Sequence, residues 1–241
     1  MRKQLLPIVS ALLVIVLGGC ATKDPDAVEA NDPLEPANRV MFNFNQLLDR
    51  NAALPAATFY RAAVPGDLRF GVHNFLSNLN LPIAVANDML QGQVTRAGDA
   101  SGRFVINSTL GVAGLFDVAT DWGLPEQEED FGQTLGYYGV PEGPYLVLPF
   151  LGPKPPRDLA GSYVDAFFSP LAYVHFKGRP YWALARSALT TVDKRSANIE
   201  LLREIERSSV DYYATMRSLY RQRRADAIKN GVEDGQPLPD F

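Results

Sequence analysis

The sequence predicts a mainly α-helical protein. Apolar residues recur at helical spacing in several segments, most clearly over residues 40–48, 94–110, 181–206 and 210–229. The chain holds 19 glycines and 18 prolines, which exceeds ordinary usage, so we expect helices that are short, kinked or joined by tight turns. The hydrophobic fraction of 46% is enough for a core and for an apolar outer surface as well.

The first twenty residues have the pattern of a bacterial lipoprotein signal peptide. Arg2 and Lys3 precede an apolar run, which ends in the sequence LGGC at residues 17–20. Cys20 is the single cysteine of the chain. Cleavage before Cys20 would leave a thiol that can carry a diacylglycerol and an amine that can take another acyl chain. Two or more acyl chains give stable anchoring, so we expect a protein tied to a membrane without spanning it.

Two other interpretations of this segment are less favoured. A transmembrane helix needs roughly 20 apolar residues, and this run has only about 13. If the segment were an ordinary signal peptide, the position of the cysteine directly after Leu-Gly-Gly would be a coincidence. An aspartate directly after the cysteine would favour retention at the inner membrane. The chain has Ala21 there, which favours the outer membrane. We therefore expect a signal peptide over 1–19, a lipidated tether over 20–31, a single helical domain over 32–230 and a loose tail over 231–241.

The helical domain is predicted to begin at Asp32-Pro33, as N-cap and first helical position. Further helical pieces are expected between the prolines at 55 and 65, and over residues 67–79, 83–90 and 94–110.

The most apolar stretch after the signal peptide is FVINSTLGVAGLFDVA, at residues 104–119. Polar residues and glycines interrupt it, so it is too broken to span a bilayer. A buried core segment is the favoured interpretation, and a helix lying in one leaflet is the alternative. The acidic run at 126–130 is expected to be a solvated loop, since a calcium site would want alternating ligands and a turn glycine.

Residues 131–152 are rich in glycine, proline and tyrosine. Residues 145–148 could form a short strand, giving a hairpin around 141–144. Glycines allow such a loop unusual backbone angles. The aromatic side chains of this loop are free to contact something outside the core.

The C-terminal part is predicted to form one long helix over 181–206 and another over 210–229. The second carries a basic cluster, which consists of Arg217, Arg221, Arg223 and Arg224. Such a helix could lie on anionic head groups. It could equally be a surface helix packed by its tyrosines.

Catalytic and metal-binding motifs are nearly absent. His73 and His175 lie on separate segments without ligand spacing, and no serine lies in a Gly-x-Ser-x-Gly elbow. We therefore expect a protein that is not an enzyme and has no metal. Removal of residues 1–19 reduces the 23 Lys and Arg residues to 21 against 27 Asp and Glu, a net charge of −6, which is not typical of a nucleic-acid-binding protein.

Several blocks of the chain closely resemble the MlaA/VacJ family of outer-membrane lipoproteins. The most specific are DPLEPANRVMFNFN at 32–45 and FGQTLGYYGVPEGPYLVLPFLGP at 131–153, with NFLSNLNLP at 74–82 and RFVINSTLGVAGLFDVA at 103–119 between them. The resemblance covers about residues 31–225. One departure is Asp211-Tyr212-Tyr213, where the family usually has a proline after the aspartate.

The resemblance implies a ring of helices lying in one membrane leaflet around an amphipathic channel, with a short glycine-rich hairpin. It implies that phospholipids astray in the outer leaflet of the outer membrane pass through the channel to a soluble periplasmic carrier, MlaC, which maintains lipid asymmetry. The implied partners are phospholipids, this carrier and a trimeric outer-membrane porin. The covalent lipid on Cys20 would be the only bound group. A lipase or phospholipase, or a lipoprotein that only braces a porin, is the alternative.

Six residues are candidates for the lipid path. Asn43, Phe44 and Asn45 are expected where the first helix lies in the membrane plane, with Phe44 in apolar surroundings and the asparagines bonded to backbone or polar-wall groups. The loop over 131–152 is expected to form or gate the pore wall. Its candidates, which each combine an apolar ring with a polar tip, are Tyr137, Tyr138 and Tyr145. The alternative is a rigid hairpin that only packs the ring.

Overall fold

A computed structural model describes residues 22 and 24–230. The expected signal peptide, Cys20 and the tail over 231–241 lie outside the described residues. The helical elements, in chain order, are α2 (Pro25–Glu29), α3 (Glu35–Leu48), the π-helical turn η2 (Asp49–Ala53), α4 (Leu54–Ala63), α5 (Gly66–Asn78), α6 (Leu81–Leu90), α7 (Val94–Thr109), α8 (Val118–Asp121), α9 (Phe131–Tyr137), α10 (Pro156–Phe168), the 3-10 turn η3 (Pro170–Ala172), α11 (Arg179–Ala197), α12 (Ile199–Ser208) and α13 (Tyr212–Ile228). Two short strands, β1 (Val147–Leu148) and β2 (Gly152–Pro153), pair antiparallel.

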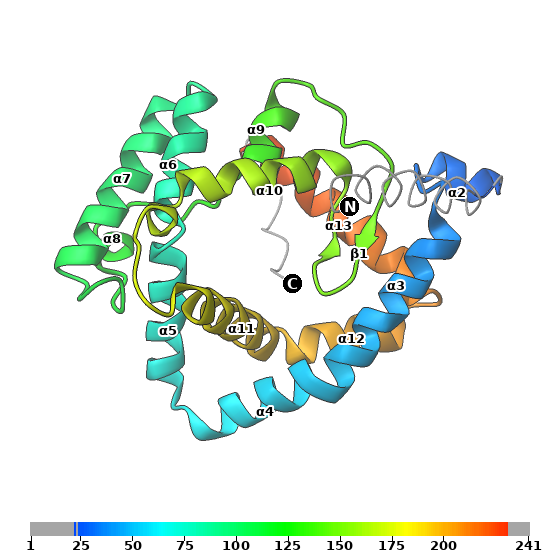
Figure 1. Ribbon diagram of the computed structural model, residues 1–241, viewed down its shortest axis with the longest axis horizontal. Coiled ribbons are helices and arrows are strands. Elements are labelled where there is room, and N and C mark those ends of the chain that lie inside the picture. The colour runs from blue at the N-terminus through cyan, green and yellow to red at the C-terminus, as the bar shows by residue number, and fades with distance from the viewer. Residues whose placement is uncertain (1–21, 23, 231–241) are drawn as a thin grey trace, which may run out of the picture.

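The helices follow one another around a ring (Figure 1). The chain runs from α3 through η2 into α4, then α5, then the paired helices α6 and α7. Helices α9 and α10 pack together on the opposite side, and α13 leads back toward α3. Helix α11 lies inside the ring and packs against α4 and α5. The prediction of a mainly helical protein with short, bent segments is confirmed.

Prolines set several corners of this ring. The first turns of α3, α6, α10 and α11 each contain a proline. A proline there loses no helical hydrogen bond, and its fixed φ suits the helix, but it stops a preceding helix from running on. The abundance of proline therefore divides the chain into short helices that change direction.

The two ends of the ring meet at Asp32, which is fully buried. Its Oδ2 accepts hydrogen bonds from the Tyr213 hydroxyl at 2.5 Å and from Arg217 at 2.6 Å, both on α13. Its Oδ1 accepts one from Asn38 Nδ2 at 2.7 Å. The prediction that Asp32 caps the first helix is wrong, because its carboxylate is used to join the N-terminal helix to α13 and α3 begins at Glu35.

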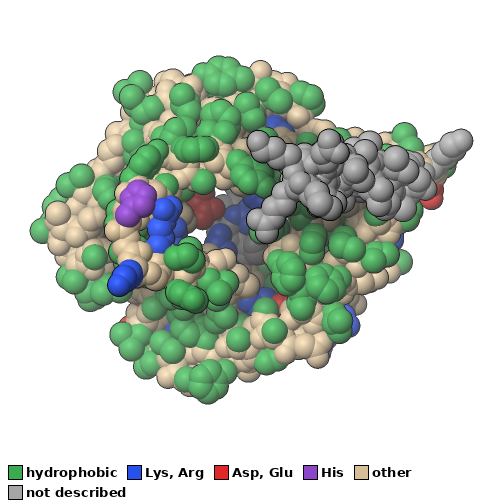
Figure 2. Space-filling model, viewed as in Figure 1, with side chains coloured by type: hydrophobic (Ala, Val, Ile, Leu, Met, Phe, Trp, Pro, Cys, Tyr) green, Lys and Arg blue, Asp and Glu red, His purple; other side chains and the backbone are tan. Residues whose placement is uncertain are grey.

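The distribution of polar and apolar side chains is unusual for a globular domain. The described residues include a small apolar core of Tyr145, Val147 and Tyr213. Many buried side chains are instead polar or charged, while large apolar side chains such as Phe59, Phe116 and many others are exposed. Figure 2 shows such side chains spread over the visible face, around a central hollow in which charged groups are seen. Within the described part of the chain, no helix is long and apolar enough to cross a membrane.

Three local predictions differ from the structure. The hairpin turn lies at 149–151, between β1 and β2, and not at 141–144, where the chain is an extended loop. The long helix over 181–206 is broken at Asn198, whose backbone angles leave the helical region. Part of the expected tether is folded, since α2 lies within it and Ala27 is buried.

The favoured interpretation of residues 104–119 as a buried core segment is also wrong. Helix α7 ends at Thr109, and the turns that follow expose their large apolar side chains, such as Leu110, Val112 and Phe116. Apart from the small side chain of Ala119, the buried side chains of this region are polar. Arg103 and Asn107 both bond to Asp117, at 2.9 Å and 2.8 Å. The apolar residues of the segment therefore face outward, as the alternative interpretation requires.

Candidate functional site

Two asparagines on one face of α3 hold the hairpin. Asn38 and Asn45 are seven residues apart, which places them on the same side of a helix. Asn38 Nδ2 donates to the Tyr145 carbonyl at 2.9 Å, and its Oδ1 accepts from the Val147 amide at 2.9 Å. Asn45 repeats the pattern three residues further along the hairpin, donating to the Leu148 carbonyl at 2.9 Å and accepting from the Phe150 amide at 2.8 Å. We call this arrangement the asparagine clamp.

The clamp ends at a strained turn. Phe150 has a φ of 65°, which is uncommon for a bulky residue, and its side chain is 78% exposed. Its ring meets the edge of Phe44 with centroids 5.7 Å apart. Such backbone conformations persist where the surroundings determine them, and here the Asn45 side chain and the Phe44 ring do so. Figure 1 shows that the hairpin is directed into the ring.

The side of α3 that faces away from Asn38 is apolar and exposed, and Phe44 lies at its edge toward the hairpin. Val40, Phe44 and Leu47 follow helical spacing and are 60%, 37% and 59% exposed. Asn43 is also exposed. Helix α3 thus separates an exposed apolar stripe from the polar face that carries the clamp.

The three candidate tyrosines do not lie together. Tyr137 and Tyr138 are exposed at the end of α9, with their rings edge to face at 5.5 Å. The Tyr138 hydroxyl donates to the Leu90 carbonyl at 2.6 Å, which ties α9 to the end of α6. Tyr145 is only 1% exposed and packs against Tyr213 in the core. The structure therefore brings Phe44 and Asn45 to the hairpin tip and places Tyr145 in the core beneath the hairpin.

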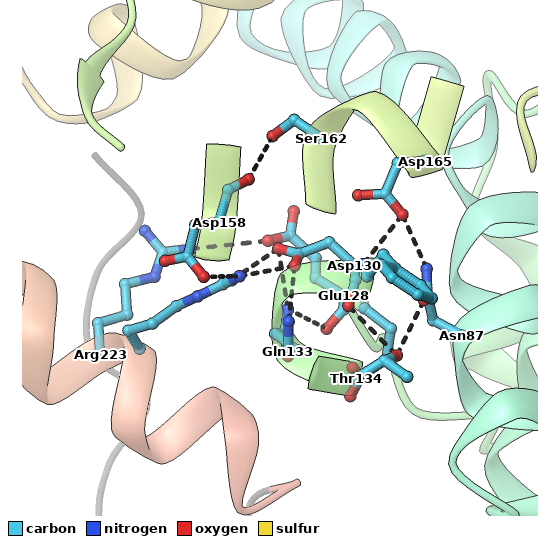
Figure 3. Close-up of polar contacts among 12 residues, drawn as sticks. Asn87, Glu128, Asp130, Gln133, Thr134, Asp158, Ser162, Asp165 and Arg223 are labelled. Atoms are coloured by element: carbon cyan, nitrogen blue, oxygen red, sulfur yellow. Dashed lines mark hydrogen bonds and ion pairs between the residues drawn. The ribbon is translucent and has the colours of Figure 1, made fainter. Parts of the chain in front are cut away.

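The acidic run is a loop, as expected, but it is solvated only in part. Glu126 and Glu128 are exposed, whereas Glu129 is buried and Asp130 docks against other helices. Asp130 caps α9 by accepting from the Gln133 amide at 2.9 Å, and both its carboxylate oxygens accept from Arg224 on α13 at 2.6 Å (Figure 3). Arg224 also bonds to Asp158, which is buried on α10, at 2.9 Å. Burial opposes ionisation of Asp130, but the Arg224 guanidinium outweighs it and the pKa of that carboxyl is lowered. This contact joins three helices.

The basic cluster on α13 faces carboxylates of the protein itself. Arg217 pairs with Asp32, and Arg221 pairs with Glu142 at 2.8 Å. Arg223 lies 3.6 Å from Glu128. These pairings support the interpretation of 210–229 as a packed helix over that of a helix on anionic head groups.

A second polar cluster lies where α6, α7 and α9 meet. Arg96 contacts two buried carboxylates, Asp88 at 3.2 Å and Glu129 at 2.8 Å. Gln91 donates to the other oxygen of Glu129 at 3.0 Å. Burial raises the pKa of Glu129 to about 7, against the hydrogen bond from Gln91 and the charge of Arg96 and with the help of the Asp88 charge.

Glu129 is expected to make the protein less stable as the pH rises through this range. A carboxyl whose pKa is raised from 4.5 to about 7 in the folded state keeps its proton there to a higher pH than in the unfolded chain. Its contribution to the free energy of unfolding is therefore fully present below about pH 4.5 and is lost by about pH 7. The difference amounts to about 3 kcal/mol in the free energy of unfolding. Urea unfolding of Glu129→Gln between pH 5 and pH 7 should show a flatter pH dependence than that of the unchanged protein.

The matched control for this prediction is Glu128→Gln. It removes the same charge from the neighbouring residue, whose side chain is 54% exposed. It should leave the pH dependence as it is. An unchanged slope in Glu129→Gln would contradict the assignment.

Among the described residues, His73 and Asp193 are the pair that most resembles a catalytic histidine with its carboxylate. His73 Nδ1 lies 3.0 Å from Asp193 Oδ2, and this hydrogen bond raises the pKa of the imidazole against its burial. No contact of a serine hydroxyl with either histidine is found among the described residues. The pair joins α5 to α11. In the same part of the chain, no group of three or more His, Cys, Asp or Glu side chains could hold a metal ion.

These features define a class of protein: a ring of short helices with buried polar groups, exposed large apolar side chains and a hairpin clamped inside the ring. The sequence pattern of the MlaA lipoprotein family matches residues 30–227. The chain belongs to this family, and the resemblance found in the sequence is confirmed.

The chain is similar to several relatives along most of its length. It is 35% identical to the intermembrane phospholipid transport system lipoprotein MlaA of Haemophilus influenzae, over 97% of this chain and 95% of the relative. It is 36% identical to the protein of the same name in Escherichia coli, over 92% and 88%. A solved structure described as "Structural basis for maintenance of bacterial outer membrane lipid asymmetry" matches with a TM-score of 0.73 and 35% identity, over 82% of this chain and 98% of that one.

Sequence reasoning missed Asp32 and Asn38 as key residues, although both stand in the DPLEPAN block that carried the resemblance. The type of Asn38 could have indicated its role, since an asparagine side chain can both donate to and accept from backbone groups. What the sequence did not give was the partner, because Tyr145 and Val147 lie more than a hundred residues away.

Proposed function

We propose that this protein removes misplaced phospholipids from the outer leaflet of the outer membrane through an amphipathic path in its ring, and passes them to a soluble periplasmic carrier. One observation carries the proposal: large apolar side chains are exposed on the ring, while charged and polar side chains are buried within it. Exposed apolar surface of this extent is typical of contact with a membrane or a protein partner.

The physics of the task fits such a ring. A lipid that crosses bare bilayer must move a charged head group through hydrocarbon, which is very costly without polar partners. A polar inner wall lowers this barrier, and an apolar belt keeps the ring within one leaflet. No bond is made or broken, so no catalytic group is needed. Direction comes from the carrier, which is MlaC in the family that the sequence resembles. A trimeric porin is the proposed partner in the membrane.

The test of this function is complementation. The chain is expressed in a Gram-negative strain that lacks its own MlaA, and phospholipid in the outer leaflet is measured by labelling lipids at the cell surface. The proposal expects the label to fall to the level of the parent strain. A label that stays high, with the protein correctly lipidated and in the outer membrane, would contradict it.

Lipidation of Cys20 is the first specific prediction of this proposal. Cleavage of the LGGC box and acylation of Cys20 should leave a mature protein with about three acyl chains, which is enough for stable anchoring. Cys20→Ala should remain uncleaved and without lipid. Mass spectrometry of the mature N-terminus checks this, and an unmodified Cys20 in the unchanged protein would refute it.

We also propose that the hairpin of the 131–152 loop gates the path, with Asn43, Phe44 and Asn45 as the helix wall that it closes against. The support is the exposed tip, which rests on Phe44 and Asn45 alone in the described contacts of its turn. Tyr137 and Tyr138 are proposed to line the wall at the end of α9, where each is exposed. Tyr145 supports the gate from the core.

A reducible cross-link across this contact tests the gate. Phe44→Cys and Phe150→Cys replace two rings whose centroids are 5.7 Å apart, and a bis-methanethiosulfonate reagent joins the two thiols through a short spacer. No other free thiol is expected, because Cys20 carries lipid. With the bridge fully formed, lipid removal should fall at least about tenfold and recover on reduction. Each single variant is the control, and removal at the full rate with the bridge closed would make the hairpin scaffold only.

A hydrolase is the alternative, and the His73–Asp193 pair is the observation in its favour. Release of free fatty acid from vesicles, lost on replacement of His73 or of one serine, would establish it. The proposal expects no such release.

A further inference from the structure

Helix α11 carries an arginine, Arg186, that has no acidic partner among the described residues. Arg186 is half-buried, and its described contacts are a hydrogen bond to Asn80 Oδ1 at 2.8 Å and the ring of Trp182, 5.9 Å away. Burial lowers the pKa of its guanidinium, and no carboxylate offsets the effect. An arginine side chain keeps its charge in proteins, so this charge is held in partly dry surroundings with no counter-ion among the described residues.

Other arginines around the same part of the ring have acidic partners. Arg195, on the same helix, contacts both carboxylate oxygens of Asp49, at 2.7 Å and 3.0 Å. Arg61, on α4, contacts both carboxylate oxygens of Glu200. Arg186 therefore differs from these two arginines in having no acid beside it among the described residues.

The sequence around Arg186 is basic and rich in aromatic residues. Between Asp165 and Asp193 the chain has no acidic residue, but it has His175, Lys177 and Arg179 as well as Arg186. It is also rich in exposed aromatic side chains, including Tyr173 and Tyr181. Tyrosine and tryptophan favour the boundary between head groups and hydrocarbon.

We propose that Arg186 binds the phosphate of a phospholipid head group, with Asn80 holding one side of the guanidinium and Trp182 beside it. A guanidinium has five N–H donors in a planar fork that matches phosphate, and the contact with Asn80 uses only one of them. Helix α11 lies inside the ring, and Figure 2 shows Lys and Arg side chains beside the central hollow. The inference rests on the proposed function, since it names the chemical group that the path recognises.

The experiment uses Trp182 as the reporter. The chain has two tryptophans, so Trp122→Phe leaves Trp182 as the only one. The full lipidated protein in a non-ionic amphipol is titrated with dihexanoyl-phosphatidylglycerol, with inorganic phosphate, and with dihexanoylglycerol, which has the same chains without phosphate. Arg186→Gln should weaken binding of the phospholipid by about tenfold or more, and Arg186→Lys, which keeps the charge but not the planar fork, should recover only part of it. Binding of dihexanoylglycerol should not change.

Arg179→Gln is the matched control, because it removes the same charge from another half-buried position, in the first turn of the same helix. Its affinity should stay within about twofold of the unchanged protein, if the contact and not the general charge matters. Arg186→Gln should keep its fold, because the loss of this arginine leaves no buried carboxylate behind. Near-ultraviolet circular dichroism checks this.

The outcomes separate the two proposals. Equal phospholipid affinity in Arg186→Gln, or an equal loss for dihexanoylglycerol, overturns the phosphate site. Inorganic phosphate that competes with the phospholipid supports recognition of the phosphate group, whereas binding of inorganic phosphate alone assigns the site to free phosphate and overturns the lipid assignment. If the unchanged protein transfers lipid and Arg186→Gln transfers it equally well with equal affinity, only this inference fails. If the unchanged protein transfers none, the proposed function fails.

Discussion

Replacement of Arg217 by methionine is expected to destabilise the protein by about 3–5 kcal/mol, because it leaves the buried carboxylate of Asp32 without its cation. The hydroxyl of Tyr213 and the amide of Asn38 remain, but neither carries charge. These contacts join the N-terminal end of the ring to α13, so their loss should open the ring. Urea unfolding of the lipidated protein, followed by circular dichroism, measures the change.

Two further variants make this prediction specific. Arg50→Met breaks an ion pair with Glu206 whose side chains are 61% and 41% exposed, and should cost no more than about 1 kcal/mol. The double variant Asp32→Asn with Arg217→Met removes both charges, and should be more stable than Arg217→Met alone. A double variant no more stable than the single one would show that the buried charge is not the cause.

Deletion of Asn43 and Phe44 is expected to have the largest effect on lipid flow. Two residues fewer in α3 rotate everything that follows by about 200°, at about 100° per residue, and so turn Asn45 away from Leu148 and Phe150. The contacts of Asn45 with the hairpin are lost, while those of Asn38 with the hairpin remain. We expect the gate to leak or to stay closed, with outer-leaflet phospholipid clearly different from that of the unchanged protein.

The control for the deletion keeps the register of α3. Asn43→Ala with Phe44→Ala removes the same two side chains but leaves Asn45 in place against the hairpin. It should disturb lipid levels much less than the deletion does. Normal lipid levels in the deletion would contradict the role of the clamp, and equal effects of both variants would assign the role to the side chains alone.

The helical elements could be predicted where the pattern was local. Residues 94–110 and 210–229 were expected as helices, and α7 and α13 begin and end within two residues of these bounds. The break at Asn198 was missed because helical spacing continues across it. The hairpin was misplaced because the prolines and glycines at 141–144 favour a turn as strongly as the residues at 149–151.

Burial could not be predicted from the sequence in the same way. Periodicity gives a helix an apolar face but does not say whether that face meets a core or lipid, so residues 104–119 were assigned to a core that does not exist there. The acidic run looked solvated because its partners, Arg96 and Arg224, are distant in sequence. Asn45, in contrast, was expected to bond to backbone or polar-wall groups, and it does bond to backbone groups.

The central claim is that the ring moves phospholipid without chemistry, and reconstituted transfer tests it most directly. The lipidated protein is placed in vesicles that contain a labelled phospholipid, and the soluble carrier is added outside and then separated. We expect intact labelled phospholipid on the carrier only when the protein is present, with less of it when the cross-link between positions 44 and 150 is closed. The claim would be contradicted if no lipid reached the carrier, or if the label appeared as free fatty acid.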